Sequence, residues 1–469
     1  MHTRTIVAPM LLLVLASSLV AGDAVDEYIR RGIKQRSIPG LSLAAIRDGR
    51  MIKVAGYGRA SLELDAPATA DTVYEIGSIT KQFTAEAVML LVEDGRLGLD
   101  DPIARHLPPT PDSWRPITIR HLLTHTSGLK DWEAAGVLPY HSEYTPSDYI
   151  ALIARFPLDF PPGEQFRYTN SGFPLLGMII ERASGQAYTA FVTSRILKPL
   201  GLAATRFKDP GEVVTGRAEG YVLQDGVFRR GEQLRPAVIA PNGGIMTTAA
   251  DLASWAAAVF NGRLLGPESL REMLTPVRLN SGRTVNHGFA WFMTTFNGHR
   301  IILHPGTTIG GYSAVVYHYP DDRLTVVALA NLDDGAFGVD TMVQRVADDY
   351  VPGVWFTGLK RQTDPDPKMT EALIDLLKSV AEGGNPSQLL PTAQAALTPT
   401  IRAETASRLQ AQTAFEFIGE ERRSPFHFVL GPDADRFRRY RMVTGGRVVY
   451  YTFSLAGDGK VVGFRAIAE

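Results

Sequence analysis

The 469-residue chain contains no cysteine. This absence excludes disulfide bonds, thiolate metal ligands, a thiol nucleophile and the attachment of lipid through a cysteine. Any chemistry in this protein must therefore use oxygen or nitrogen side chains, or a metal ion held by histidine.

The chain also lacks an imbalance of charge. Its 48 lysines and arginines nearly cancel its 49 aspartates and glutamates, which leaves a net charge of −1. A balanced chain gives no electrostatic reason to expect a nucleic acid or an acidic membrane surface as a partner. The composition, 45% hydrophobic and 21% charged, is typical of a folded protein with a sizeable core. The length allows a main domain of enzyme size and a smaller second domain.

Long apolar runs are missing except near the start, where MHTR precedes IVAPMLLLVLASSLV and the small residues Ala21 and Gly22. The order basic, apolar, small is typical of a cleavable signal peptide, so we expect residues 1–22 to be removed and the protein to be exported, periplasmic or secreted. An uncleaved anchor is the alternative, since the run approaches the length that spans a bilayer. Pro9 favours cleavage, and no stable membrane anchor is then expected.

Strand patterns lie at the two ends of the following 340 residues or so, and helical patterns lie between them. Residues 42–61 have the pattern of two strands joined by a turn at Asp48-Gly49, and β-rich segments recur over 300–330. Together they predict a mixed α/β domain with an antiparallel sheet whose edges are filled by the two ends of the domain. Helical spacing predicts helices over 80–94, 173–183, 249–260 and 338–350.

A smaller domain is predicted near the C-terminus. The alternating prolines of TDPDPK are typical of a linker, which we place at 361–369. This gives a first domain over 23–360 and a small α+β accessory domain over 370–469. The accessory domain begins with a helical pattern at 370–381 and continues as short strands, among them PFHFVLG (425–431) and RFRRYR (436–441). We interpret the basic residues of RFRRYR as the solvent face of an alternating strand.

One short segment, GSITKQ, has the spacing of a nucleophile and its base. Ser78 and Lys81 are three residues apart at the start of a predicted helix, so their side chains can meet on one face. The N–H groups and the dipole of such a helix start stabilise a developing oxyanion. A lysine whose pKa is lowered by burial or by a nearby cation can take the serine proton. The alternative is a helix cap with a solvated lysine.

The spacing alone is not specific, because it occurs again at Ser127 and Lys130 in HTSGLK. Gly128 interrupts helical geometry there, whereas Ser78 leads into a strong helical pattern. If either serine is a nucleophile, we expect it to be Ser78.

Two other segments could supply partners to a nucleophile. FRYTNSG (166–172) places Tyr168 and Asn170 in a predicted loop, where a tyrosine can relay protons and an amide can hold a lysine or a substrate carbonyl. LHPGTTIGGY (303–312) is β-rich and then rich in glycine, which suits close approach of the backbone to a ligand. The alternatives are a packed ring, a turn residue and, for His304, an edge-strand histidine.

Two other patterns lack the residues that their chemistry requires. His121 and His125 are four residues apart, but the glutamate of an H-E-x-x-H motif is missing and no further ligand cluster follows. We therefore interpret them as structural and predict no metal site. The serine elbow G-x-S-x-G does not occur in the sequence either.

In order along the chain, these segments resemble the serine β-lactamase and penicillin-binding-protein superfamily. The branch is that of class C β-lactamases, D-alanyl-D-alanine carboxypeptidases, D-aminopeptidases and related esterases. Its motifs S-x-x-K, Y-x-N and [KH]-x-G match Ser78–Lys81, Tyr168–Asn170 and His304–Gly306, and flanks such as EIGSITKQFTA and GGIMTTAADLASW are also similar. The resemblance covers about 25–355. It implies a β-lactamase-like fold with a mostly helical subdomain, and no cofactor or metal.

The resemblance also implies a role for each motif residue. Ser78 is expected to be acylated, with Lys81 as its activating neighbour. Tyr168 is expected to share the role of base and to protonate the leaving group. The residues expected to bind substrate or to complete the oxyanion hole are Asn170, His304, Gly306 and Thr307.

The third motif departs from the family pattern, because His304-Pro305-Gly306 stands where β-lactam enzymes usually carry Lys-Thr-Gly or Lys-Ser-Gly. The change removes a fixed cation and a hydroxyl group that would bind a substrate carboxylate, and Pro305 fits only an edge or unbonded ladder position. We therefore expect a serine hydrolase for a small ester, amide or peptide, of esterase or D-amino-acid peptidase type, ahead of a β-lactamase or D-alanyl-D-alanine carboxypeptidase. The alternative of another class is a non-catalytic ligand-binding relative.

Overall fold

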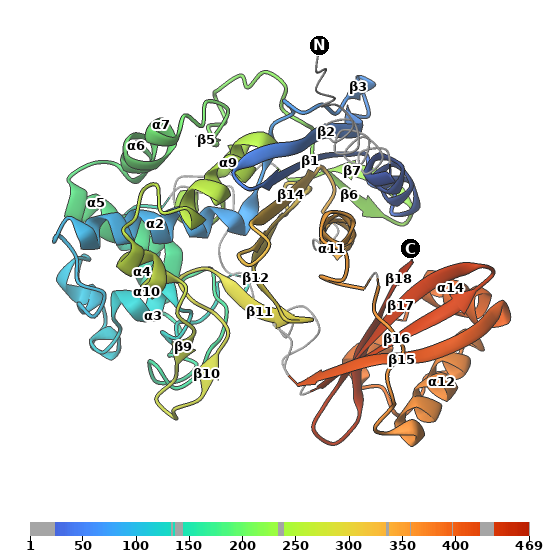
Figure 1. Cartoon of the computed structure of the whole chain (residues 1–469). Helices are drawn as coiled ribbons and strands as arrows, with labels where there is room; N and C mark the ends of the chain where they lie inside the picture. The colour runs from blue at the N-terminus through green and yellow to red at the C-terminus, as the bar shows by residue number, and fades with distance from the viewer. Residues whose placement is uncertain are drawn as a thin grey trace, which may run out of the picture. The chain divides into compact units, whose positions relative to one another are not determined.

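The computed structural model of the protein describes residues 24–132, 135–136, 144–232, 239–333, 337–356, 358–395, 397–422 and 436–468. The chain divides into two compact units, Met1–Val351 and Pro352–Glu469 (Figure 1). The expected signal peptide, residues 1–22, and the expected strand at 425–431 lie outside the described residues. No helix within these ranges is long and apolar enough to cross a membrane.

The first unit is built on a seven-stranded antiparallel sheet in the order β11-β12-β13-β14-β1-β2-β3. A helix over 24–35 precedes the sheet. The strands are β1 (Gly40–Arg47), β2 (Arg50–Ser61), β3 (Ala66–Pro67), β11 (Phe292–Phe296), β12 (His299–Thr308), β13 (Tyr312–Tyr319) and β14 (Leu324–Ala330).

The two ends of the first unit meet inside the sheet. β1 pairs with β14, with Leu41 opposite Ala330, and β1 pairs on its other side with β2. The expectation that the ends of the domain fill the sheet edges was therefore wrong, since the edges are β11 and β3. The turn predicted at Asp48-Gly49 is confirmed between β1 and β2.

Helices cover both faces of the sheet centre. Val316 and Leu329 belong to the core that includes Trp255 of α9 (Ala249–Phe260). Tyr317, which points to the other face because neighbouring strand residues alternate, instead donates to Asp340 of α11 (Phe337–Tyr350). Strands covered on both faces are continuous apolar runs rather than alternating ones.

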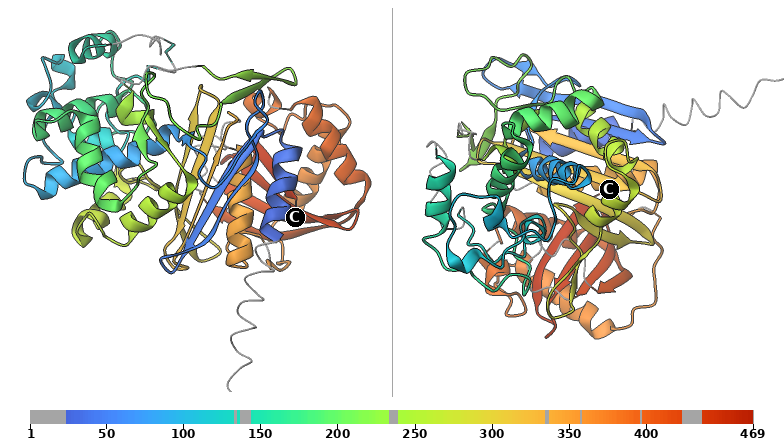
Figure 2. Two further views of the ribbon diagram at one scale, coloured as in Figure 1. Left: turned by 90° about the horizontal axis from the view of Figure 1, so that it is seen from above. Right: turned by 90° about the vertical axis from the view of Figure 1, so that its left-hand side faces the viewer.

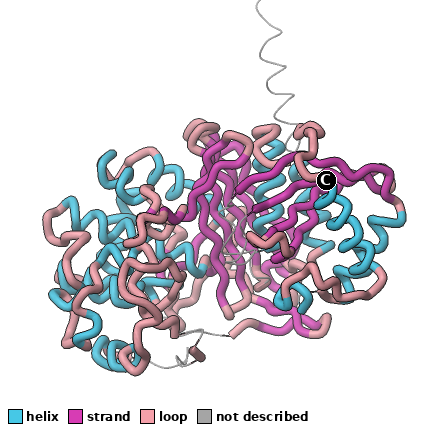
Figure 3. Tube along the Cα trace, turned by 90° about the horizontal axis from the view of Figure 1, so that it is seen from below, coloured by secondary structure: helices cyan, strands magenta, loops and turns pink. Residues whose placement is uncertain are grey.

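Most of the segment between β3 and β11 forms a mostly helical subdomain to one side of the sheet, whereas α9 of the same segment covers a face of the sheet (Figure 2). The predicted fold class, an antiparallel sheet flanked by helices with a helical subdomain, is thus confirmed (Figure 3). Helices predicted over 80–94, 173–183 and 249–260 correspond to α2, α5 and α9. The helices are α2 (Thr80–Glu93), α3 (Ile119–Leu123), α4 (Pro146–Ile153), α5 (Gly172–Ser184), α6 (Tyr188–Val192), α7 (Lys198–Leu200), α8 (Ala240–Gly243), α9 and α10 (Pro267–Met273).

Short strands connect these helices. One small sheet has the order β4-β8-β5, and two hairpins are formed by β6-β7 and β9-β10. Their bounds are β4 (Tyr74–Glu75), β5 (Arg206–Phe207), β6 (Tyr221–Gln224), β7 (Val227–Arg230), β8 (Ile245–Thr247), β9 (Val277–Arg278) and β10 (Thr284–Val285). β4 matters for the site, because it leads directly to Gly77 and Ser78.

The second unit is a small α+β structure. Its antiparallel sheet has the order β15-β16-β17-β18, and its core joins Leu373 and Leu377 of α12 to Tyr440 and Phe453 of the sheet. The elements are α12 (Pro367–Ala381), α13 (Pro391–Ala395), α14 (Pro399–Gln410), β15 (Gln412–Arg422), β16 (Arg436–Thr444), β17 (Arg447–Leu455) and β18 (Val461–Ala468).

The interpretation of RFRRYR as a solvent face was wrong. Arg438 is fully buried and Arg439 is 4% exposed. The Arg438 guanidinium pairs with Asp364 and Glu420, and Arg439 pairs with Glu421 at 2.7 Å. Buried arginines are tolerated because carboxylates neutralise them.

Candidate active site

Ser78 lies on a short 3-10 turn, Gly77–Ile79, between β4 and the start of α2. Gly77 has a φ of +49°, and a Cβ atom there would lie 2.3 Å from the backbone oxygen of Thr307. Only glycine permits this approach, since any side chain would clash with β12. The turn therefore brings half-buried Ser78 against the end of β12.

A second glycine makes the same approach from the strand. A Cβ atom on Gly306 would lie 2.0 Å from the backbone oxygen of Ile76. Gly77 thus lies against the backbone of Thr307, and Gly306 lies against that of Ile76. Thr307 is therefore beside the serine turn, where its N–H and that of Ser78 are the expected oxyanion donors.

Lys81 is the second residue of α2 and is fully buried. Its Nζ lies 3.0 Å from Ser78 Oγ, 2.8 Å from Asn170 Oδ1 and 3.1 Å from the backbone oxygen of Asn242. Three acceptors match the three N–H bonds of a lysine ammonium group. The structure thus brings the first motif together with Asn170 of the second.

Tyr168 completes the contact between the three motifs. Lys81 Nζ lies 5.2 Å from the centre of the Tyr168 ring and 5.6 Å from that of Phe173. The Tyr168 ring centre lies 6.0 Å from that of His304 on β12. Residues that are far apart in the sequence therefore surround one buried lysine, and half-buried Ser78 lies beside it.

His304 begins the part of β12 that β11 does not cover. β11 pairs with β12 only as far as Leu303. Pro305, which has no N–H, therefore lies past the end of this pairing, in an unbonded position on the β11 side of β12, as expected. Burial, reinforced by the charge of Lys81, lowers the pKa of His304 well below its usual value, so its imidazole is neutral. Its Nδ1 lies 2.5 Å from the backbone oxygen of Pro305, which can only accept, so Nδ1 carries the proton. Nε2 is then an acceptor, buried and with no partner in the described part of the chain.

Two more buried imidazoles, those of His125 and His287, lie near Tyr168. The ring centre of His125 is 4.3 Å from that of Tyr168 and 5.2 Å from that of His287. Burial lowers the pKa of His287 to about 3 and that of His125 well below its usual value. No group of three or more ligand-type side chains suits a metal ion among the residues the structure covers.

The remaining sequence candidates do not come together. His121 bonds to Thr118 and caps α3, which ends at Leu123, so His125 lies outside that helix. In the second S-x-x-K match, Ser127 Oγ accepts from Leu129 N, while Lys130 pairs with Asp159 at 3.2 Å.

Sequence reasoning missed several contacts of the site. Asn242 contributes only its backbone oxygen, which has no signature in a sequence, and Asp131 accepts from the backbone N–H of Asn170 at 2.6 Å. Phe173 and His287 have the pattern of ordinary core residues. The one sequence signal available for Asp131 was its position in a loop, two residues after HTSGL.

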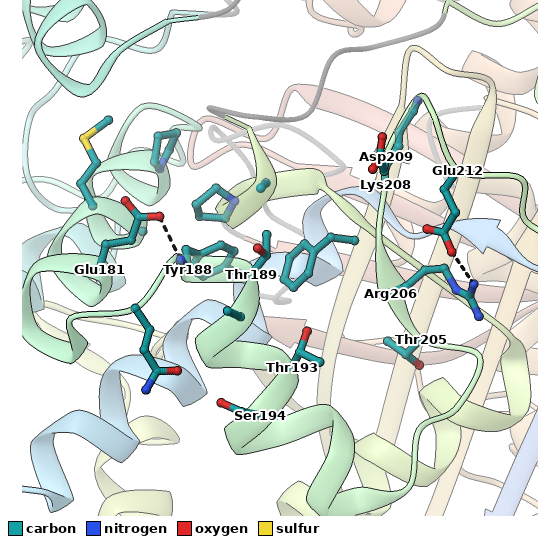
Figure 4. Close-up of a pocket in the computed structure, with 18 of the residues that line it drawn as sticks. Glu181, Tyr188, Thr189, Thr193, Ser194, Thr205, Arg206, Lys208, Asp209 and Glu212 are labelled. Carbon is teal, nitrogen blue, oxygen red and sulfur yellow. Dashed lines mark hydrogen bonds and ion pairs between the residues drawn. The ribbon is translucent and has the colours of Figure 1, made fainter.

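A separate groove with a volume of about 1270 Å³ lies in the helical subdomain, between α5, α6, β5 and α8 (Figure 4). None of the motif residues lines it. Some of its charged groups bond within the groove wall: Glu181 accepts from Tyr188 N at 2.9 Å and Arg206 pairs with Glu212 at 2.8 Å. Pro241 also lines it, so the groove adjoins the segment that holds Lys81.

A serine–lysine pair seated where a helical subdomain meets an antiparallel sheet is the arrangement of the penicillin-recognising serine hydrolases. The β-lactamase family model matches residues 25–350, and the chain belongs to this family of serine hydrolases related to β-lactamases and penicillin-binding proteins.

Three known proteins illustrate the similarity. Penicillin-binding protein 4* of Bacillus subtilis strain 168 is 30% identical over 310 residues, which cover 62% of this chain and 68% of that protein. The D-amino acid amidase of Ochrobactrum anthropi SV3 is 27% identical, with a TM-score of 0.61, over 70% of this chain and 99% of the amidase chain. An octameric penicillin-binding protein homologue of Pyrococcus abyssi is 24% identical, with a TM-score of 0.60, over 95% and 98% of the two chains, which shows a shared fold.

Proposed function

We propose that the protein is an exported serine hydrolase that cleaves an ester or an amide through an acyl-enzyme, as an esterase or a D-amino-acid peptidase does. The observation that carries the proposal is the buried ammonium group of Lys81, held at once by Ser78 Oγ, Asn170 and the Asn242 carbonyl. A lysine that merely capped a helix would lie in solvent.

In the proposed acylation, Ser78 Oγ attacks the substrate carbonyl carbon and loses its proton to the pair formed by Tyr168 and Lys81, in which Tyr168 takes the proton as a phenolate and the Lys81 ammonium group stabilises that phenolate. The oxyanion accepts the N–H groups of Ser78 and Thr307. Tyr168 returns the proton to the departing alcohol or amine, which leaves an acyl group on Ser78. Water then attacks the acyl-enzyme with the same pair as base, and the acid product leaves.

The neutral state of His304 supports the substrate class. Burial and the nearby charge of Lys81 hold its pKa well below the usual value, so the third motif supplies no cation for a substrate carboxylate. An ester or amide without a free carboxylate beside the scissile bond suits this site better than a penicillin or a peptide ending in D-alanine.

Similarity to the D-amino acid amidase supports the amide alternative. The apolar run within residues 1–22, preceded by a basic stretch and followed by small residues, supports export.

Intact-protein mass spectrometry tests the proposal. Wild type and Ser78→Ala are each incubated with a fluorophosphonate, a penicillin, a short-chain aryl ester and a D-amino acid amide. We expect a covalent adduct with the fluorophosphonate in the wild type alone, and turnover of ester or amide at least tenfold faster than acylation by penicillin, a difference of about 1.4 kcal/mol in transition-state stabilisation. Equal melting temperatures show that both proteins are folded.

Two results would contradict the proposal. Unchanged turnover in Ser78→Ala would remove the serine from the mechanism. A folded wild type that takes no label from any reagent would instead favour a ligand-binding relative without catalysis.

A further inference from the structure

The segment that carries Tyr168 and Asn170 has no regular secondary structure over 165–169. A strand or helix would hold two such side chains through its own hydrogen bonds, and this segment cannot. Its geometry must be set by the parts of the protein that bond to its backbone.

One loop supplies those bonds. Arg167 N donates to the His125 backbone oxygen at 2.9 Å, and Thr169 N donates to His125 Nδ1 at 3.3 Å. Asn170 N donates to Asp131 Oδ2 at 2.6 Å. The backbone N–H groups of Arg167, Thr169 and Asn170 are thus bonded to two residues of the loop HTSGLKD, 125–131.

The next residue strengthens the connection. Ser171 Oγ donates to the Lys130 backbone oxygen at 2.6 Å and accepts from Trp132 N at 3.0 Å. Further back, Gly163 N donates to the Thr126 oxygen at 2.8 Å. The two segments are therefore bonded along their length.

The conformation of His125 shows that this contact is specific. Its φ is +56°, in the left-handed region that a histidine rarely adopts. The ring lies on Tyr168 with 4.3 Å between centres and a tilt of 30°. Nδ1 accepts the Thr169 N–H, so a neutral ring carries its proton on Nε2. Because burial keeps the pKa of His125 far below its usual value, the ring remains an acceptor at neutral pH.

We propose that His125 and Asp131 are positioning residues for the reaction: they hold the backbone of 167–170 so that Tyr168 and Asn170 meet Lys81. Neither residue is assigned contact with the substrate. The proposal rests on the proposed function, because it names what sets the geometry of that reaction. Displacing catalytic groups by about 1 Å can cost about 100-fold in rate.

The test compares three variants. Asp131→Ala removes the acceptor for Asn170 N–H, and Asp131→Asn keeps an oxygen that can accept it. Asp159→Asn is the matched control: Asp159 pairs with Lys130 and Arg167 of the same two segments, without bonding to the backbone at 168–170.

For Asp131→Ala we expect kcat for an aryl ester to fall about 100-fold with little change in KM. Asp131→Asn should recover most of this loss, and Asp159→Asn should stay within about threefold of wild type. Hydrogen exchange of the peptide covering 166–172 should accelerate in Asp131→Ala and stay protected in the other two variants.

His125→Phe gives an independent test, because it keeps an aromatic ring against Tyr168 but removes the acceptor for Thr169 N–H. We expect faster exchange of the same peptide and a lower kcat, with KM again little changed.

The hydrogen-exchange result separates this proposal from the proposed function. If wild type shows no turnover, the proposed function fails, while exchange in the variants still decides whether the loop holds the segment. If Asp131→Ala keeps wild-type exchange at 166–172, or loses no more kcat than Asp159→Asn, the positioning role is refuted. Should Asp131→Ala not fold, accelerated exchange in His125→Phe supports the role and unchanged exchange overturns it.

Discussion

The carboxyl group of Glu86 allows a prediction about stability. Glu86 is fully buried in α2, and burial, opposed by a 2.9 Å hydrogen bond from Trp255 Nε1, raises its pKa from 4.5 to about 7. Between these values the folded protein keeps a proton that the unfolded chain has lost. The free energy of unfolding therefore falls by about 1.4 kcal/mol per pH unit as pH rises through this interval, or about 3 kcal/mol in all, and the loss stays constant above pH 7.

Replacing the carboxyl group by an amide removes this titration. We expect Glu86→Gln to gain stability over the wild type as pH rises from 5 to 7, by about 3 kcal/mol once the full shift is passed, and to keep that gain at pH 8. Other titrating groups are common to both proteins and cancel in the difference. At pH 5 the two proteins should differ little.

Urea unfolding followed by tryptophan fluorescence measures the difference. Four of the five tryptophans lie in the first unit, so the signal reports mainly on its unfolding. The control is Glu268→Gln, at a carboxyl group that is 92% exposed. A stability difference between Glu86→Gln and wild type that stays constant from pH 5 to 8 would refute the reasoning.

Two further predictions concern the histidine cluster and the glycine contact. The folded pKa of His287 is about 3, below that of an unfolded histidine near 6.5, so wild type should lose stability as pH falls from 6.5 towards 3. His287→Phe should lose less, and an equal fall in the melting temperatures of the two proteins between pH 7 and pH 4 would contradict this. Gly77→Ala places a Cβ atom 2.3 Å from Thr307 O, so both melting temperature and turnover should fall. Gly243→Ala, with nothing within 4 Å of the added atom, should leave both unchanged, and similar losses in the two variants would count against the contact.

The parts of the site that could be predicted from the sequence either lie close together in the chain or belong to the family motifs. Ser78 and Lys81 share one helix start, so their meeting follows from helical spacing. Asn170 lies 89 residues from Lys81, and only the ordered motifs brought the two together. The Asn242 carbonyl and the role of Asp131 could not be foreseen, because both depend on backbone groups of segments whose separation only the folded chain defines.

For the fold as well, local elements could be predicted and long-range contacts could not. α9 was predicted from its helical spacing, and in the structure Thr248 caps it by accepting from Asp251 N at 3.2 Å. The order of strands was not predicted, since pairing depends on partners far along the chain. The alternation of RFRRYR favoured an exposed face, yet Asp364 comes from outside that strand and makes burial of Arg438 tolerable.

The pairing of β1 with β14 has a consequence for how the chain folds. Gly40 N donates to Asn331 Oδ1 across 291 residues of sequence, and β1 lies at the centre of the sheet rather than at its edge. During synthesis β1 emerges early but finds its second neighbour only when residues 324–330 have been made. Contacts so distant in sequence slow folding, because a long loop must close before they form. In a chain stopped before residue 324, Ser78 and Lys81 should therefore lie at the start of a nascent α2 that lacks the completed sheet.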